Sequence, residues 1–306
     1  MKKPTQISDQ ELIKTLKCTK TELQQFKACQ QQALKEAQVY KKRFFSKKIK
    51  IIGISGSYRT ANDSAAEDSK TEWLLNEALD HAKKLGAEVE LIRLKDYEIK
   101  PCKGCYSTTN TQCQFPCTCY PPGEFGDDMT NKLYKKVYQA DGIIFATPVH
   151  NYKVSSLTCL FIDRLISMDG SLSPADKNNP KDKELNIKHS KFVNLTAKDN
   201  QFGSGYLRRF IGKVGSIIVS NHEAGAAMAI SSLYMTMSHW GMIFPPFSNM
   251  YATAGVLDGT YTDTKKIKNN PEYSKMAKEI AENVFVTIKM VKNNPKLFWT
   301  YDSTIN

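Results

Sequence analysis

The stretch that decides the fold is KIKIIGISGSYR, at residues 48–59. Its first seven residues are mostly apolar and β-branched, which is typical of a buried strand. Serine and glycine follow at 55–57, where a tight turn is expected. Apolar residues recur at helical spacing from Thr71 onward, so a helix should begin near that residue. The stretch therefore predicts a strand, a short loop and the start of a helix.

A loop of this kind is suited to binding an anion. The first N–H groups of a helix have no backbone partner, and the helix dipole favours negative charge there. Hydroxyl donors and one cation are added by Ser55, Ser57, Ser69, Thr71 and Arg59. The Gly-x-Gly-x-x-Gly dinucleotide fingerprint is missing, which favours a monophosphate over a pyrophosphate. The alternative is an ordinary strand-to-helix loop with exposed serines.

Strands and helices alternate along the rest of the chain. Further strands are expected at 88–94, 142–147, 214–220 and 242–244, and helices at 71–85, 127–139, 155–168, 225–240 and 271–292. Residues 169–212 are polar and rich in Lys and Asn, and we expect them to cross the surface as an insertion. The alternation predicts an α/β fold with right-handed crossovers and a doubly wound parallel sheet of five strands.

Ligands of open α/β sheets bind beyond the carboxyl ends of the strands. Three of these ends carry distinctive residues, at 55–59, 147–152 and 220–225. The first suits a phosphate, while the other two offer backbone donors, aromatic area and polar tips for a flat heterocycle. We therefore expect one crevice lined by all three segments.

Positive charge is concentrated at the N-terminus. The first 48 residues contain eleven Lys and one Arg against four acidic residues, so they carry +8 of the net +12. This basic extension should form two helices, at 8–16 and 19–45, and the second has an apolar stripe that needs a covering surface. We expect the stripe to pack on the main domain, 49–306, or on a second subunit.

The basic extension could contact an acidic redox protein or a membrane surface, but a solvated helical face is the commoner meaning of such charge. Its uneven distribution argues against a nucleic-acid partner. The N-terminal residues are polar and lack an apolar signal core, which indicates a cytoplasmic protein. The apolar run at 224–244 contains a histidine, several serines and two glycines, so a core helix is expected there and no membrane insertion.

Five motifs between Ile49 and Met168 resemble, in the same order, the family of NADPH-dependent FMN reductases and iron-sulfur flavoproteins. They are IGISGSYR at 52–59, PCKGC at 101–105, DDM at 127–129, ADGIIFATPV at 140–149 and FIDR at 161–164. Each motif alone is weak, but the set is specific. The resemblance implies a flavodoxin-like sheet, with strand order 2-1-3-4-5, that binds FMN.

The resemblance also implies site residues. Those that would hold the phosphate are Ser55, Ser57, Arg59, Ser69 and Thr71. Those that would border the isoalloxazine ring are Pro148, Val149, His150, Asn151 and Tyr152, with His222, Glu223, Ala224 and Gly225 at its far edge. The segment 60–68 is longer than the usual loop of the family. No catalytic side chain is expected, because the flavin carries the reaction.

Five of the eight cysteines lie within 18 residues, a density that core packing explains poorly. The resemblance implies that four cysteines hold a [4Fe-4S] cluster here in the iron-sulfur flavoproteins, whereas relatives of the FMN reductase type often keep part of the motif without a cluster. Thr108 stands where the third of these cysteines would fall. The candidate ligands are Cys102, Cys105, Cys113 and Cys117, with Cys119 as an alternative. Three interpretations stay open: a [4Fe-4S] cluster, a zinc site, or thiols or a disulfide without metal. Because the loop follows the second strand, we expect it near the ligand crevice.

Together these features predict an FMN-dependent oxidoreductase that takes hydride from NADPH or NADH. The electrons would pass to a flavin, a quinone, a nitro compound or an iron-sulfur acceptor. The alternative is a flavoprotein electron carrier without substrate turnover, reduced by a ferredoxin-like partner. Since one subunit covers an open crevice incompletely, we also expect a homodimer or homotetramer.

Overall fold

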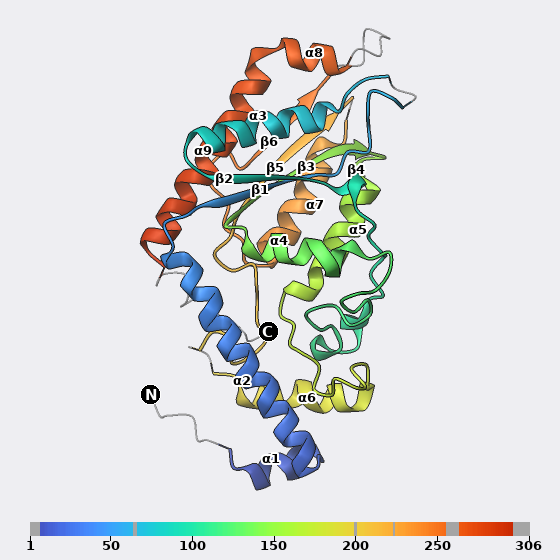
Figure 1. Ribbon diagram of the computed structural model, residues 1–306, viewed down its shortest axis with the longest axis vertical. Coiled ribbons are helices and arrows are strands. Elements are labelled where there is room, and N and C mark those ends of the chain that lie inside the picture. Colours follow the sequence, from blue (N-terminus) through green and yellow to red (C-terminus); the bar gives the residue numbers. More distant parts are fainter. Residues whose placement is uncertain (1–6, 64–65, 199–200, 223, 255–262, 296–306) are drawn as a thin grey trace.

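The computed structural model describes residues 7–63, 66–198, 201–222, 224–254 and 263–295 (Figure 1). The parallel strands of its sheet are β1 (Lys50–Ser55), β2 (Glu88–Arg93), β3 (Gly142–His150), β5 (Val214–Asn221) and β6 (Asn249–Thr253). Their order is β2-β1-β3-β5-β6, which is the predicted order 2-1-3-4-5 when the parallel strands alone are counted. The flavodoxin-like α/β fold expected from the sequence is therefore confirmed.

Helices cover both faces of the sheet (Figure 1). One face carries α3 (Lys70–Lys84) and α9 (Pro271–Asn293), and the other carries α4 (Tyr134–Gln139), α5 (Ser156–Leu165) and α7 (Ala226–His239). Successive residues of β1 alternate between the two layers, because Ile51 packs with α3 and α9 while Ile52 packs with α4, α5 and α7. The central strands are thus buried on both sides, which explains their continuous apolar sequences.

The last strand lies further along the chain than the sequence analysis expected. Ile243, in the predicted strand 242–244, makes an isolated bridge to Val214 and no strand. Two prolines follow at 245–246, and proline has no N–H to donate to a neighbouring strand. The edge strand β6 therefore forms beyond them, with exposed and buried residues in alternation.

The N-terminal extension folds back on the insertion of the same chain. It consists of α1 (Asp9–Leu16) and α2 (Lys20–Lys42), close to the predicted boundaries. The buried stripe of α2 packs on α6 (Lys183–Thr196), where the ring of Phe26 stacks on that of His189 with 5.0 Å between their centroids. The apolar stripe of α2 is thus covered by a helix of the same chain.

The sequence predicts that the insertion at 169–212 crosses the surface, but in the structure this segment also contributes to a core. It contains the helix α6 and buries Phe192, Phe202 and Phe210. Tyr40 of α2 donates a hydrogen bond to the backbone carbonyl of Arg209, with 2.8 Å between the oxygens. The polar sequence hid this packing because the apolar partner lies about 160 residues upstream, in α2.

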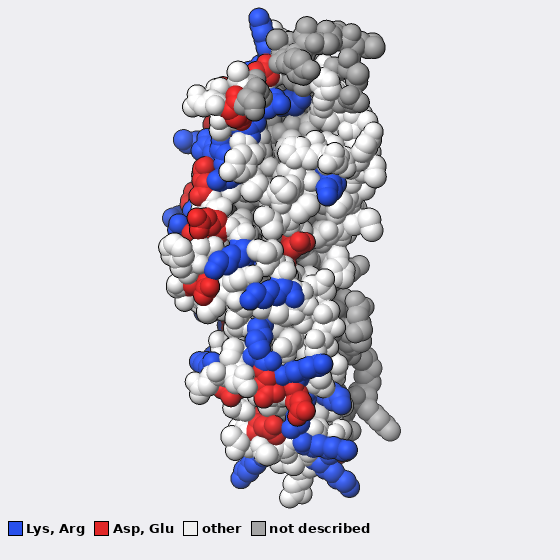
Figure 2. Space-filling model, turned by 90° about the vertical axis from the view of Figure 1, so that its right-hand side faces the viewer, with Lys and Arg blue, Asp and Glu red and all other residues white. Residues whose placement is uncertain are grey.

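Figure 2 shows the side of the molecule toward which the strands run. Charged side chains gather along its left edge and over its lower third, where α1, α2 and α6 lie, and much of the remaining surface is uncharged. A short helix that the sequence analysis did not predict, α8 (Asp263–Asn269), stands at the opposite end. Within the described ranges, no helix has both the length and the apolar character needed to cross a membrane.

Candidate functional site

A pocket of about 230 Å³, here called the strand-end pocket, opens where β1, β3 and β5 end. Eight of the predicted site residues line it: Ser57, Arg59, Ser69, Thr71, Pro148, Val149, His150 and His222. Four further residues line it: Tyr58, Ser220 and Asn221, which lie in the predicted strand-end segments, and Lys70, which does not. This lining contains two fixed cations and no carboxylate, which suits an anionic ligand.

The loop after β1 is held against the start of α5. The N–H of Gly56 donates to the carbonyl of Ala146 at 2.8 Å, and Ser155 Oγ donates to the carbonyl of Gly56 at 2.6 Å. A Cβ at position 56 would lie 1.9 Å from Thr158 Oγ1, so this close approach requires glycine. Ser55 is fully buried beneath the turn and lies behind the pocket wall.

The first turn of α3 brings a helix N-terminus and a buried cation together. Ser69 Oγ accepts a hydrogen bond from the N–H of Glu72 at 3.1 Å and so caps the helix, while its own O–H can still donate. The side chain of Lys70 is buried, and its Nζ donates to the carbonyl of Asn221 at 3.2 Å. The ammonium group and the positive end of the helix dipole therefore lie side by side, an arrangement that favours phosphate.

Two predicted phosphate ligands already interact with other side chains. Thr71 Oγ1 lies 2.5 Å from Ser220 Oγ, which joins α3 to the end of β5. Arg59 lies 3.7 Å from a carboxylate oxygen of Glu67, in the segment that is longer than the family's usual loop. The long loop thus supplies Glu67 as a counter-ion for the arginine. An incoming anion would displace this carboxylate or share the guanidinium with it.

A hairpin forms another part of the wall. β3 continues to His150 and pairs there with the short antiparallel strand β4 (Lys153–Val154). Asn151 and Tyr152 form the two-residue turn, with φ of 48° and 63°. Positive φ at both positions is what a type I′ turn requires. These two predicted ring neighbours therefore lie at the tip of the hairpin and are absent from the pocket lining.

The segment after β5 approaches this hairpin. A Cβ at Gly225 would lie 2.8 Å from Tyr152 Cα, so the two backbones are in contact. Ala224 is exposed and lies outside the lining, whereas His222 belongs to it. Glu223 falls outside the described residues.

The five clustered cysteines line a second, small cavity: Cys102, Cys105, Cys113, Cys117 and Cys119. The sulfur atoms of Cys105 and Cys119 are 2.9 Å apart, and both thiols are free. Two thiolates on one tetrahedral zinc ion would be about 3.8 Å apart, given zinc–sulfur bonds of about 2.3 Å. In the described part of the chain, no three His, Cys, Asp or Glu side chains are arranged to hold a metal ion. The candidate ligands are brought together, but as a cluster of thiols.

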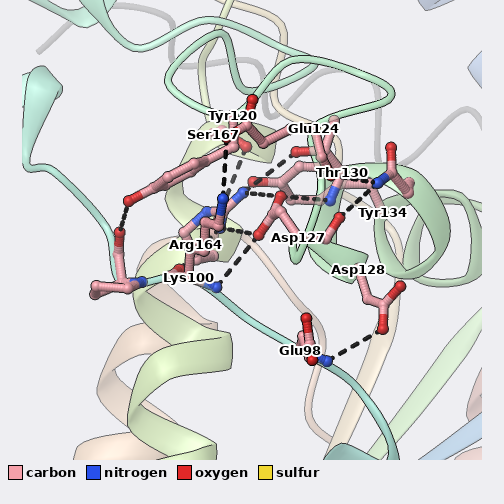
Figure 3. Close-up of polar contacts among 12 residues, drawn as sticks. Glu98, Lys100, Tyr120, Glu124, Asp127, Asp128, Thr130, Tyr134, Arg164 and Ser167 are labelled. Carbon is pink, nitrogen blue, oxygen red and sulfur yellow. Dashed lines mark hydrogen bonds and ion pairs between the residues drawn. The ribbon is translucent and has the colours of Figure 1, made fainter.

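A buried arginine, Arg164, lies beside the thiols, and Figure 3 shows its polar contacts. Arg164 makes two hydrogen bonds to the carboxylate of Asp127, at 2.6 and 2.9 Å, and both side chains are almost completely buried. The guanidinium also donates to the carbonyl of Lys100 at 2.8 Å and lies 4.6 Å from the centre of the Tyr120 ring. Its Nε has no hydrogen-bond partner among the described residues. The arginine thus joins α5 to the start of the cysteine loop and to the segment before α4.

One thiol of the cavity is strongly acidic. A hydrogen bond with Cys119, followed by the positive charge of Arg164, lowers the pKa of the Cys117 thiol to about 5 despite its burial. The pKa of Cys119 is raised by the same hydrogen bond. Burial raises the pKa of the Cys113 thiol to about 12. The cavity therefore combines one thiol whose pKa is lowered with two whose pKa is raised.

The two cavities lie at opposite ends of α5. Ser155 at its start holds the loop of the strand-end pocket, whereas Arg164 and Ser167 at its far end line the cysteine cavity. A ten-residue helix is about 15 Å long, and the two linings share no residue. The cysteine loop therefore does not line the strand-end pocket, and its nearness to the ligand crevice stays a prediction.

Comparison with known proteins adds family information to this geometry. Residues 49–186 match the family model of the NADPH-dependent FMN reductases. An iron-sulfur flavoprotein of Archaeoglobus fulgidus is 34% identical over 116 residues, which are 38% of this chain and 48% of that protein. An iron-sulfur flavoprotein of Methanocaldococcus jannaschii is 35% identical over 116 residues, which are 38% of this chain and 51% of that protein. The chain thus spans about half the length of the curated relatives it matches.

Among solved structures, RosB with a bound 8-demethyl-8-formylriboflavin-5'-phosphate intermediate is similar, with a TM-score of 0.54. The alignment covers 81% of each chain at 17% sequence identity, so it shows the fold alone. The family match, in contrast, includes β1 to β3, the loop after β1 and all five clustered cysteines. Over residues 49–186, the chain is similar to the NADPH-dependent FMN reductase family.

Proposed function

We propose that this chain is an FMN-dependent oxidoreductase that takes hydride from NADPH or NADH. The observation that carries the proposal is the strand-end pocket, in which the buried ammonium of Lys70 lies beside the N-terminus of α3 and Arg59 lines the same space. A pocket with these donors favours a phosphate group. The match of residues 49–186 to the FMN reductase family supports the oxidoreductase role.

In this proposal the side chains bind and orient the cofactor, and none is catalytic. FMN supplies the hydride and electron chemistry when it is bound. The residues proposed to hold its phosphate are Ser57, Arg59, Ser69, Lys70 and Thr71, with Ser55 supporting the loop from behind. Pro148, Val149 and His150 would border the ring and His222 its far edge. The electron acceptor would be a flavin, a quinone, a nitro compound or an iron-sulfur partner.

The phosphate assignment is tested by comparing FMN with riboflavin, which has the same ring and no phosphate. Lys70→Met should weaken FMN binding by about tenfold or more, because a charge-assisted hydrogen bond contributes roughly 1.5–3 kcal/mol. Riboflavin binding should hardly change. Titration of flavin fluorescence measures both, and Lys84→Met, at the exposed far end of α3, is the matched control. Equal losses for both flavins would reject the assignment, and absence of flavin binding would reject the function.

The alternative function is a flavoprotein electron carrier, with or without a [4Fe-4S] cluster, that is reduced by a ferredoxin-like partner and turns over no substrate. The observation in its favour is that five thiols line one cavity beside Arg164. The short contact between Cys105 and Cys119 speaks against ligand geometry, so no step of the proposed reaction depends on a cluster. Anaerobic purification decides the cofactor: about four iron and four sulfide per chain would establish the cluster. In stopped-flow mixing, rapid flavin bleaching by NAD(P)H would select the enzyme.

A homodimer or homotetramer stays a prediction. The stripe of α2, which first suggested a contact between subunits, is covered by α6 of the same chain. An exposed apolar face remains on α7, formed by Met228, Tyr234 and Met235. Light scattering of the whole chain measures the oligomeric state, and the mass of a monomer would reject the prediction.

A further inference from the structure

A larger pocket, of about 590 Å³, lies between the cysteine loop and α7, and is here called the α7 pocket. Tyr106 of the loop and Met235 of α7 line it, and at least half of each side chain is exposed. Ile162 and Ile166, from α5 and the turn after it, complete an apolar interior. The volume is in the usual range of small-molecule sites. The α7 pocket shares no residue with the strand-end pocket, so it is a separate space.

The walls of the α7 pocket are aromatic and firmly held. Trp240 is 2% exposed and stacks on Phe210, with 4.6 Å between the ring centroids and 17° between the planes. This stack fixes the indole edge that reaches the pocket. Tyr106 adds a second ring and Met235 a thioether. Rings and thioethers of this kind bind flat aromatic molecules through stacking and sulfur–aromatic contacts.

The charge of the lining restricts the ligand further. Among the described residues of the lining, Asp163 is the one carboxyl group and His239 the one basic side chain. The adjacent Arg164 turns to Asp127 and leaves Asp163 without that counter-ion. A carboxylate in the wall repels anions. Phosphate-bearing molecules such as FMN and NADPH are therefore disfavoured here.

We propose that the α7 pocket binds an uncharged aromatic molecule of two or three fused rings. The rings lie against Trp240, and Met235 covers them from the solvent side. Polar groups at the edge set the orientation: Thr236 Oγ1 donates to the carbonyl of Ser232 at 3.0 Å, so its lone pairs remain to accept from a ligand hydroxyl. This site goes beyond the proposed function and does not depend on it.

The site is tested on protein saturated with FMN, so that a flavin occupies the strand-end pocket. The probe is 2-(hydroxymethyl)anthracene, an uncharged three-ring molecule that is not a quinone and does not add to thiols, and equilibrium dialysis measures its binding. One saturable site per chain is expected. Met235→Arg should weaken binding by about tenfold or more, because it puts a charge against the apolar wall. Met228→Arg is the matched control, since it lies on the same face two turns earlier, is also exposed and is absent from the lining.

A charged probe tests the role of Asp163. Anthracene-2-sulfonate should bind more weakly than the neutral probe, and Asp163→Asn should narrow the difference in affinity between the two. Absence of saturable binding would overturn the proposal, as would equal losses in both arginine variants or equal affinity for both probes. A fall in molecular mass on Met235→Arg alone would also overturn it, because the face would then be a contact between copies. Flavin absorbance reports on the proposed function separately.

Discussion

At the scale of single residues, Arg164 joins three segments of the chain through one buried guanidinium (Figure 3). Arg164→Leu would leave the carboxylate of Asp127 buried without its partner. We expect the free energy of unfolding to fall by roughly 3–5 kcal/mol, as measured by urea denaturation. The double variant Arg164→Leu with Asp127→Leu should lose less than the sum of the single variants. A loss below about 1 kcal/mol for Arg164→Leu would show that the pair does not hold the loop.

Gly56 is the second residue with a sharp expectation. In Gly56→Ala the new methyl group would lie 1.9 Å from Thr158 Oγ1, so the loop must move away from α5. Both the melting temperature and the affinity for FMN should fall, the latter by about tenfold or more as the phosphate donors move. Thr158→Ala in the same chain removes the closest atom and should restore part of both. If the single variant binds FMN like the wild type, the position of this loop does not control the site.

At the scale of elements, the hairpin β3–β4 contains a strained residue at its tip. Tyr152 has φ of 63° and is 60% exposed, so its side chain contributes little packing to offset the left-handed backbone. Tyr152→Gly should raise the free energy of unfolding by about 1 kcal/mol, as measured by thermal or urea denaturation. Asn151→Gly, at the other turn position, should change less, because asparagine tolerates this conformation. A destabilised Tyr152→Gly protein would show that the ring makes contacts worth more than the strain.

The elements that the sequence predicted correctly are those with a strong local pattern. β1, β3 and β5 are continuous apolar runs, which the sequence shows directly. The residues of the strand-end pocket could then be predicted, because they follow the carboxyl ends of these strands. β6 was placed too early, because 242–244 is more apolar than the half-exposed edge strand at 249–253. α6 was missed because its buried side meets α2, a contact that a local pattern does not contain. Lys70 was missed because a lysine in the first turn of a helix usually belongs to the surface.

At the scale of the whole molecule, the extension and the insertion share a core around His189. This side chain is 1% exposed, and neither ring nitrogen has a hydrogen-bond partner among the described residues. Burial lowers its pKa to about 4, whereas the unfolded chain returns it to about 6.5. Between pH 4 and pH 6.5, His189 therefore binds a proton in the unfolded chain but not in the folded one. Stability should therefore be full above pH 6.5, fall as the pH drops toward 4 and level off below, with a total loss of about 3 kcal/mol.

His189→Phe tests this expectation, because phenylalanine can stack on Phe26 and takes up no proton. Urea denaturation at several pH values should show a smaller loss of stability between pH 6.5 and 4.5 than in the wild type. His150→Phe, at an exposed position, should keep the wild-type dependence. Parallel curves for the wild type and His189→Phe would contradict the role of this histidine.

The stack of Phe26 on His189 has a further consequence, for the order of events during synthesis. Phe26 is made about 160 residues before its partner. At translation rates of about 5–20 residues per second, roughly 8–30 s separate the two. Throughout that interval the apolar stripe of α2 has no α6 to cover it on the growing chain. A chaperone holding the nascent helix, or slow and dilute expression, would therefore protect this protein, and aggregation on overproduction would begin at its first helices.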